Sequence, residues 1–301
     1  MKKINQINSL IVLALVLSFT FFSSCSKERI EPKEEELNNY ESMNDYFNTK
    51  KQEEQEFVID TSGSGPIVGN QGTKIWASKE KLMYVNGDSV HWPYTVKLIE
   101  LYTPKDMLYY QMPTVADGNL LTTGGEIRIR AFKDGEELVL RQNKTWTVEM
   151  PNDNPENDMK IYYGVENISF VDWTPIPAGV FDTTSYGYTG EIVILGWVAC
   201  GKDAGNFTST TNYSFTSTID NLENVSIFIY FPNLKSLMQV YNQTSGALPI
   251  GEDIKIILMG INVSNQLFYY YVETQVSTSN QIDITLTSVS DADLTAILDA
   301  L

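Results

Sequence analysis

The sequence predicts an all-β protein: two antiparallel β-sandwich units follow a disordered acidic tether, and a short helix ends the chain. The sandwiches are predicted by two stretches, residues 72–150 and 205–301, in which short β-prone runs alternate with polar turns such as Asp-Gly and Gly-Gly. The helix is predicted by Ser290, a suitable N-cap, placed before the apolar residues Leu294 and Leu298.

The clearest strand is residues 126–132. Ile127 and Ile129 share one face of it, while Arg128 and Arg130 share the other. An Asp-Gly pair follows and predicts a tight turn into the next strand. This alternation is typical of a sheet with one buried face.

Two later runs complete the first unit. In residues 145–150, Trp146, Val148 and Met150 alternate with polar residues and are expected to point inward. Residues 191–200 are β-prone, and the run from Ile192 to Trp197 is almost continuously apolar, which predicts a strand covered on both faces.

The N-terminus reads as an export signal. Lys2 and Lys3 precede an apolar segment at 10–22 that is too short to span a bilayer comfortably. Cys25 follows small residues at the end of this signal, which resembles the lipobox of bacterial lipoproteins, in its relaxed Bacteroidetes form. The resemblance implies that Cys25 becomes the lipidated first residue of the mature protein. The alternative is an ordinary secreted protein with a stray cysteine.

Residues 26–56 are dominated by glutamate and are expected to remain mobile, with transient helix at most, because few apolar residues can offset the ordering entropy. Lys27-Glu28 and residues 33–35 resemble signals that send some Bacteroidetes lipoproteins to the outer face of the outer membrane. A solvated tether without such a signal is the alternative. We divide the chain into a signal peptide (1–24), a tether (25–71), a first sandwich with an extension (72–204) and a second sandwich-like unit (205–301).

Apolar positions and turns recur over about eighty residues of the first unit, at 72–76, 96–101, 105–107, 113–114, 121–125, 134–135 and 148–151. This pattern resembles the ZU-five-type β-sandwich of ankyrins, netrin receptors and Bacteroidetes envelope lipoproteins. The chain departs from the family at 75–79, where an Ile-Pro-x-x-Ala-Phe pattern is expected. The resemblance implies that this domain mediates contacts with other proteins and has no catalytic activity of its own. The second unit resembles transthyretin-like sandwiches in pattern alone.

Composition excludes several classes of function. The net charge of −17 disfavours nucleic acid, whose phosphates are neutralised by lysine and arginine. Two cysteines and one histidine are too few for a structural zinc site or a histidine-based relay. We expect His91 to be a surface or packed residue and Cys200 to be a small buried hydrophobe. No cofactor is predicted.

Two candidate binding sites remain. Asp153, Glu156 and Asp158 offer oxygen ligands for Ca²⁺, although they lack EF-hand spacing and a polar linker is the alternative. Tyr269, Tyr270 and Tyr271 offer an aromatic platform for a glycan, although aromatic residues in strands more often pack in cores.

The sequence therefore predicts an outer-membrane lipoprotein, on the periplasmic or cell-surface side, that acts as a non-catalytic binding or structural module for another envelope protein. The alternative is a surface lipoprotein that binds glycans through its tyrosines. A carboxylate-based hydrolase ranks third, because a glycosidase needs two carboxyl groups held across a cleft.

Overall fold

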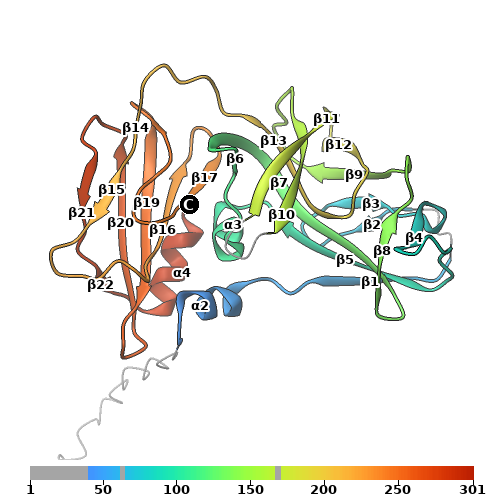
Figure 1. Ribbon diagram of the computed structural model, residues 1–301, viewed down its shortest axis with the longest axis horizontal. Coiled ribbons are helices and arrows are strands. Elements are labelled where there is room, and N and C mark those ends of the chain that lie inside the picture. Colours follow the sequence, from blue (N-terminus) through green and yellow to red (C-terminus); the bar gives the residue numbers. More distant parts are fainter. Residues whose placement is uncertain (1–39, 62–64, 167–170) are drawn as a thin grey trace, which may run out of the picture. The chain divides into compact units, whose positions relative to one another are not determined.

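The computed structural model describes residues 40–61, 65–166 and 171–301 of the chain, and for Glu166 it describes only the backbone (Figure 1). The fold is mostly β with antiparallel sheets, as predicted. The described helices are α2 (Met43–Lys50), α3 (Pro104–Tyr110) and α4 (Asp291–Asp299), with a 3-10 turn at Lys79–Lys81. The signal peptide, Cys25 and the residues up to 39 lie outside the described residues.

In the described chain, the larger sheet follows the order β1-β5-β7-β13-β10-β11-β12-β9-β3-β2 and nearly closes into a barrel. Strands β4, β6 and β8 pair off this path. The bounds are β1 (Gln55–Ile59), β2 (Ile67–Val68), β3 (Lys74–Trp76), β4 (Leu82–Tyr84), β5 (Tyr94–Leu101), β6 (Val115–Ala116), β7 (Asn119–Lys133), β8 (Glu136–Leu140), β9 (Trp146–Pro151), β10 (Lys160–Glu166), β11 (Val171–Thr183), β12 (Gly187–Ile192) and β13 (Gly196–Asp203).

The long strand β11 makes this sheet continuous. Its first part pairs with β10, through Val171 to Pro175, and its last residues, Phe181 to Thr183, pair with β12. The strands predicted as one sandwich are therefore joined in a single curved sheet around one interior.

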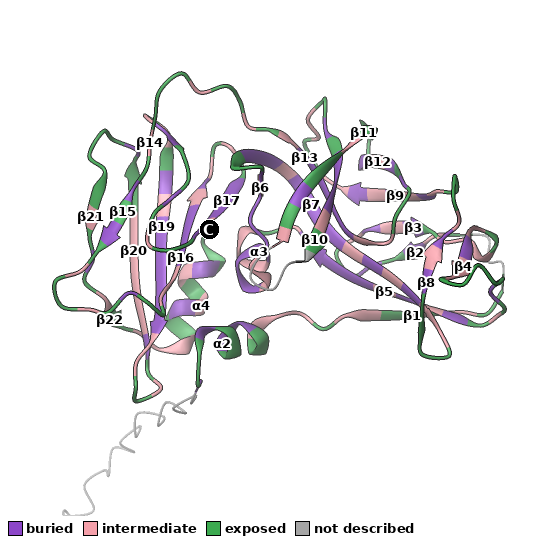
Figure 2. Ribbon diagram, viewed as in Figure 1, coloured by how far each residue is buried: buried purple, intermediate pink, exposed green. Residues whose placement is uncertain are grey.

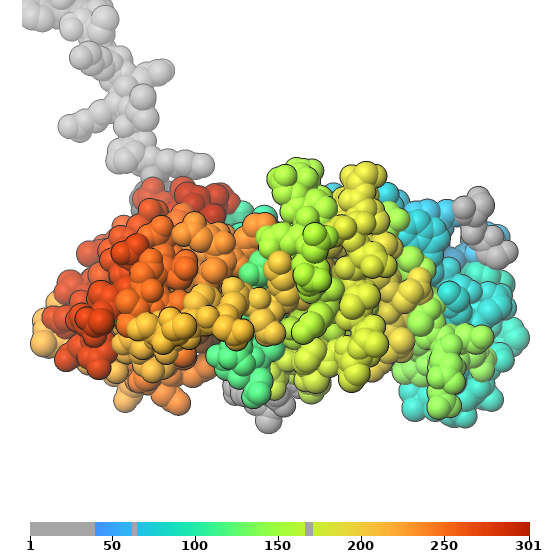
Figure 3. Space-filling model, turned by 90° about the horizontal axis from the view of Figure 1, so that it is seen from above, coloured from blue at the N-terminus to red at the C-terminus, as the bar shows by residue number. Residues whose placement is uncertain are grey.

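The second sheet has the order β17-β16-β19-β20-β22 in the described chain, flanked by the short pairs β14-β18 and β15-β21. The bounds are β14 (Thr210–Thr211), β15 (Ser214–Thr216), β16 (Ser226–Phe231), β17 (Ser236–Val240), β18 (Leu248–Pro249), β19 (Asp253–Ile261), β20 (Leu267–Gln275), β21 (Gln281–Asp283) and β22 (Thr287–Ser288). Figure 3 shows these orange and red residues gathered at one end of the molecule and the blue and green barrel residues at the other.

The alternation predicted for the central strands is confirmed. In β7, Ile127 and Ile129 are buried in the barrel interior, while Arg130 on the opposite face pairs with the exposed Glu137. In β9, Trp146 and Val148 are likewise fully buried. These strands follow the sequence pattern because one face of each is packed and the other is not.

The β-prone run at 191–200, with its apolar part at 192–197, does not form one strand, contrary to the prediction. It is divided between β12 and β13, and the chain bends between them at Val193 and Ile194, whose exposed fractions are 43% and 54%. Gly196 restarts the chain with a positive φ of 126°, which glycine adopts readily. An almost continuous apolar run can thus contain a bend between two strands of the barrel and need not form a single buried strand.

The tether prediction is wrong for residues 40–59. Ser42 caps α2 by accepting a hydrogen bond from the Asp45 amide, and β1 pairs with β5 along its whole length. Tyr46 and Phe47 are 0% exposed. The acidic composition concealed a helical spacing of apolar residues, with Met43 one turn before Tyr46 and Phe47, that gives this helix a buried face.

Helices α3 and α4 are capped as well. Thr103 caps α3 by accepting from the Asp106 amide, Pro104 occupies the first turn, and Gln111 ends the helix in the left-handed conformation. This helix was not predicted. The predicted C-terminal helix is confirmed as α4, where Ser290 is the N-cap and Leu294 and Leu298 are buried.

Three buried clusters hold the described chain in one compact unit (Figure 2). One fills the barrel, and another lies between the second sheet and the short strands beside it. The third joins the outer face of the barrel to the second sheet, with all three helices contributing. Its members include Leu101, Ala199, Phe47, Leu108, Phe228, Ile257 and Leu294. The N-terminal helix is therefore part of the core that links the two sheets.

A buried carboxylate bridges the opening of the barrel between β1 and the β2–β3 hairpin. Glu100 on β5 is 0% exposed, and its Oε1 accepts from the Thr73 amide at 2.8 Å. Its Oε2 accepts from the Gln71 amide at 2.9 Å and from Nε2 of Gln55 at 2.8 Å. Gly69 lies so close that an added Cβ would sit 2.5 Å from this carboxylate. Side-chain bonds thus join the two ends of the sheet where strand pairing stops.

Candidate functional site

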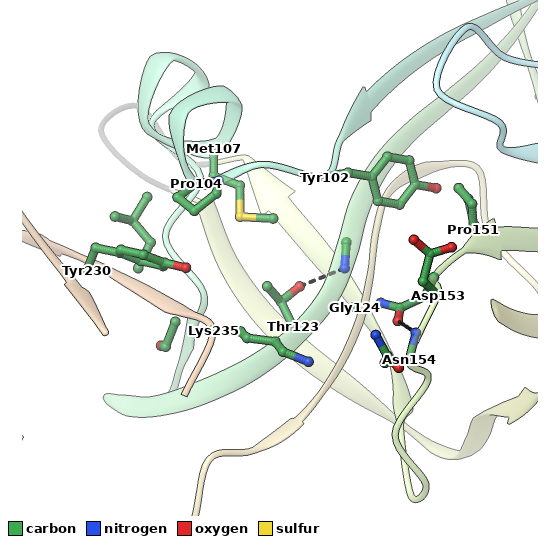
Figure 4. Close-up of a pocket in the computed structure, with 14 residues that line it drawn as sticks. Tyr102, Pro104, Met107, Thr123, Gly124, Pro151, Asp153, Asn154, Tyr230 and Lys235 are labelled. Atoms are coloured by element: carbon green, nitrogen blue, oxygen red, sulfur yellow. Dashed lines mark hydrogen bonds between the residues drawn. The ribbon is translucent and has the colours of Figure 1, made fainter. Parts of the chain in front are cut away.

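A cleft of about 360 Å³ lies between the barrel and the second sheet (Figure 4). Tyr230 and Lys235 come from the second sheet on one side, and Asp153 and Asn154 face them from the loop after β9. The other lining residues are Tyr102, Pro104, Met107, Thr123, Gly124, Gly125, Pro151, Asn152, Ser236 and Leu237. Its size and its mixture of apolar and polar residues are typical of ligand-binding clefts, which span ~300–1,000 Å³.

The floor of the cleft is a β-bulge in β7. Cys200 pairs with Gly125 and Gly201 pairs with Thr123, so Gly124 is the extra residue. A Cβ on Gly124 would lie 2.5 Å from the ring of Tyr188, which leaves room only for glycine. The Thr123 hydroxyl accepts from the Gly125 amide at 3.0 Å and fixes the bulge.

The polar groups on the two walls differ in their partners. Glu156 accepts from Lys235 at 2.8 Å and pairs with Lys202 at 3.2 Å, and the bonds from Lys235 and then Lys202 lower the pKa of its carboxyl. Within the described chain, the carboxylate of Asp153 and the hydroxyl of Tyr230 have no hydrogen-bond or ion-pair partner, and both residues line the cleft. These two groups are available to a ligand.

The predicted calcium ligands do not converge. Glu156 is held by two lysines, and Asp153 instead lines the cleft. Asp158 is an exposed turn residue with a φ of 66°. No group of three or more histidine, cysteine, aspartate or glutamate residues in the described ranges is placed to hold a metal ion.

The three tyrosines proposed as a platform do not share a face. All three are half-buried on β20, but Tyr269 and Tyr271 pack against the cluster that joins the two sheets, whereas Tyr270 packs on the opposite side of the sheet. The three tyrosines therefore do not form one shared platform, because consecutive strand residues point to opposite faces.

The single histidine and the second cysteine occupy different settings, one exposed and the other buried. His91 is exposed in a loop, as expected of a surface residue. Cys200 is free and fully buried, and burial raises the pKa of its thiol well above the ordinary value, which confirms the reading as a small hydrophobe.

An unexpected carboxylate lies in the core between the sheets. Glu126 on β7 is 0% exposed, and within the described chain neither of its oxygens has a hydrogen-bond partner. Its register partners are Leu101 and Ala199, both buried. Burial raises the pKa of the Glu126 carboxyl well above its usual range. The sequence offered no signal for it, because Glu126 occupies a position that alternates with Ile127 like any solvent-facing residue.

This carboxylate gives a testable pH dependence. Because the folded-state pKa is raised, the favourable contribution of Glu126 is fully present below the unfolded pKa of about 4.3 and is lost as pH rises toward the folded value. The loss is about 1.4 kcal/mol for each pH unit in that window. Urea unfolding of Glu126→Gln beside the native chain should show a stability difference that grows with pH in favour of the variant. If the stability difference between the two proteins does not change with pH, the pKa of Glu126 is not raised in the folded protein.

Comparison with known proteins gives no relative: no family model, curated protein or solved structure matches the chain. Among the residues that the structure describes, no helix is long and apolar enough to cross a membrane.

Proposed function

We propose that this protein is a membrane-anchored cell-envelope lipoprotein that acts as a non-catalytic binding module for another envelope protein. The signal and Cys25 support the anchor and an outer-membrane location. The described residues begin at Tyr40, 15 residues after Cys25. We also propose that the first unit is ZU-five-like and that the second unit is sandwich-like.

The observation that carries the proposal is an open sheet edge on β20. On the side away from β19, only Phe268 and Tyr269 pair with a described strand, β22, so residues 270–275 leave that edge free. An edge of six residues is long enough to accept a strand from a partner, which gains main-chain hydrogen bonds by pairing.

The strand register shows which backbone groups point outward. The Leu267 carbonyl accepts from Val289 on the β22 side, whereas the Val276 amide donates to Glu252 on the opposite side. Backbone groups alternate along a strand, so those of Tyr271 and Glu273 point away from β19. The Glu273 side chain is itself 63% exposed.

This register provides a specific test. Glu273→Pro removes one outward N–H without removing a bond to β19, whereas Glu273→Ala removes the same side chain and keeps the N–H. After chemical cross-linking in intact cells, we expect the native chain and Glu273→Ala to retain one stoichiometric envelope protein, and Glu273→Pro to lose most of it. Equal retention by both variants, with unfolding curves unchanged, would contradict pairing at this edge.

The alternative function, glycan binding, is favoured by the cleft and not by the tyrosines of β20. The cleft combines an aromatic ring, aliphatic walls and unpaired polar groups, which is the lining expected of a small-molecule site.

A further inference from the structure

We propose that the cleft between the barrel and the second sheet, defined here by Tyr230, Asp153, Asn154, Thr123 and Lys235, is a binding site for a neutral saccharide. The site is separate from the β20 edge, and the proposal rests on the alternative function, glycan binding, whose ligand class it names.

The charge of the cleft selects an uncharged ligand. The ammonium group of Lys235 is engaged by Glu156, which also pairs with Lys202. The unpaired carboxylate of Asp153 balances the remaining positive charge on the opposite wall. An anionic ligand would meet Asp153, and a metal ion would find a single free carboxylate. A neutral molecule avoids both costs.

The shape and lining select a ligand that is apolar on one side and rich in hydroxyls on the other. The ring of Tyr230 is partly packed against the core that joins the sheets, and its hydroxyl remains free in the cleft. Pro104 and Met107 extend this apolar wall. A sugar ring can place its C–H face on such a surface, much as other apolar groups pack on aromatic rings.

The opposite wall supplies hydrogen bonds for hydroxyl groups. The Asn152 side chain accepts from the Asn154 amide at 2.9 Å, which orders the loop that carries Asp153. The two side-chain oxygens of Asp153 can accept from two neighbouring hydroxyls, and the Asn154 side chain can both donate and accept. With about 360 Å³ available, the cleft suits a ligand of about one or two sugar rings.

The test uses the full chain, purified in a detergent without a sugar head group and applied to an array of neutral and acidic mono- and disaccharides. We expect retention on at least one neutral saccharide and none on acidic sugars alone. Tyr230→Ala and Asp153→Ala should each weaken that retention roughly tenfold or more. Asp60→Ala, an exposed carboxylate outside the cleft, is the matched control and should bind like the native chain.

Tyr230→Phe separates folding from recognition, because it keeps the ring and removes the hydroxyl. It should retain the saccharide more strongly than Tyr230→Ala while its unfolding curve matches that of the native chain. The proposal is overturned if the native chain binds no neutral saccharide, or if folded Tyr230→Ala and Asp153→Ala bind as well as the native chain. Capture of the envelope protein through β20 should be unchanged in these variants, so the two functions can fail separately.

Discussion

Replacing Glu100 with alanine should lower the free energy of unfolding by about 3–5 kcal/mol. The substitution leaves the amides of Thr73 and Gln71 and the side chain of Gln55 without their buried acceptor. Each buried donor that is left without an acceptor costs about 1–3 kcal/mol, and this substitution removes the acceptor of all three donors. Urea unfolding followed by tryptophan fluorescence measures the change.

Two variants sharpen this result. Glu100→Gln keeps an accepting oxygen and should lose less stability than alanine does. Glu137→Ala removes a half-exposed partner of Arg130 and should change stability by about 0.5 kcal/mol or less. A loss below about 1 kcal/mol for Glu100→Ala would show that the barrel does not depend on this bridge.

The role of Glu100 could not be predicted from the sequence. Its donors lie 27, 29 and 45 residues earlier in the chain, so the bridge exists only after β1 and β3 are in place. Within its own run, Glu100 is one acid in a β-prone segment. Strand identity was predictable because it depends on local alternation, whereas this contact depends on the topology of the whole sheet.

Phe47→Ala should destabilise the protein by about 3–5 kcal/mol, the usual cost of removing a buried phenylalanine. The Phe47 ring is 0% exposed and meets the ring of Phe228 on β16 edge-on, with centroids 6.2 Å apart. It also lies 6.4 Å from the ring of Tyr109 on α3. Loss of this ring should loosen the core that joins the two sheets.

The control for this prediction is Asn48→Ala, the next residue on the exposed side of α2, which should change stability by about 0.5 kcal/mol or less. Thermal unfolding of both variants decides between a docked helix and a mobile stalk. Equal midpoints for Phe47→Ala and the native chain would mean that α2 contributes nothing to the folded state.

The errors in the sequence-based picture have specific causes. The acidic composition of residues 26–56 predicts a mobile tether. The spacing of Met43 and Tyr46, which is also present in the sequence, indicates a helix with one buried face. A shared platform at residues 269–271 is not compatible with a strand, because the alternation of a strand separates Tyr270 from its neighbours. The cleft could not be predicted, because its walls come from segments far apart in the chain, including Tyr102, the loop after β9 and Tyr230.

The most direct test of the central proposal, an envelope protein anchored through Cys25, is membrane fractionation of cells that express the native chain beside Cys25→Ala. The native chain should partition with the membranes, and detergent should release it. Cys25→Ala should appear in the soluble fraction with the same unfolding curve, since Cys25 lies outside the described residues that form the buried clusters. If Cys25→Ala is as firmly membrane-bound as the native chain, the lipid anchor is not what holds this protein in the envelope.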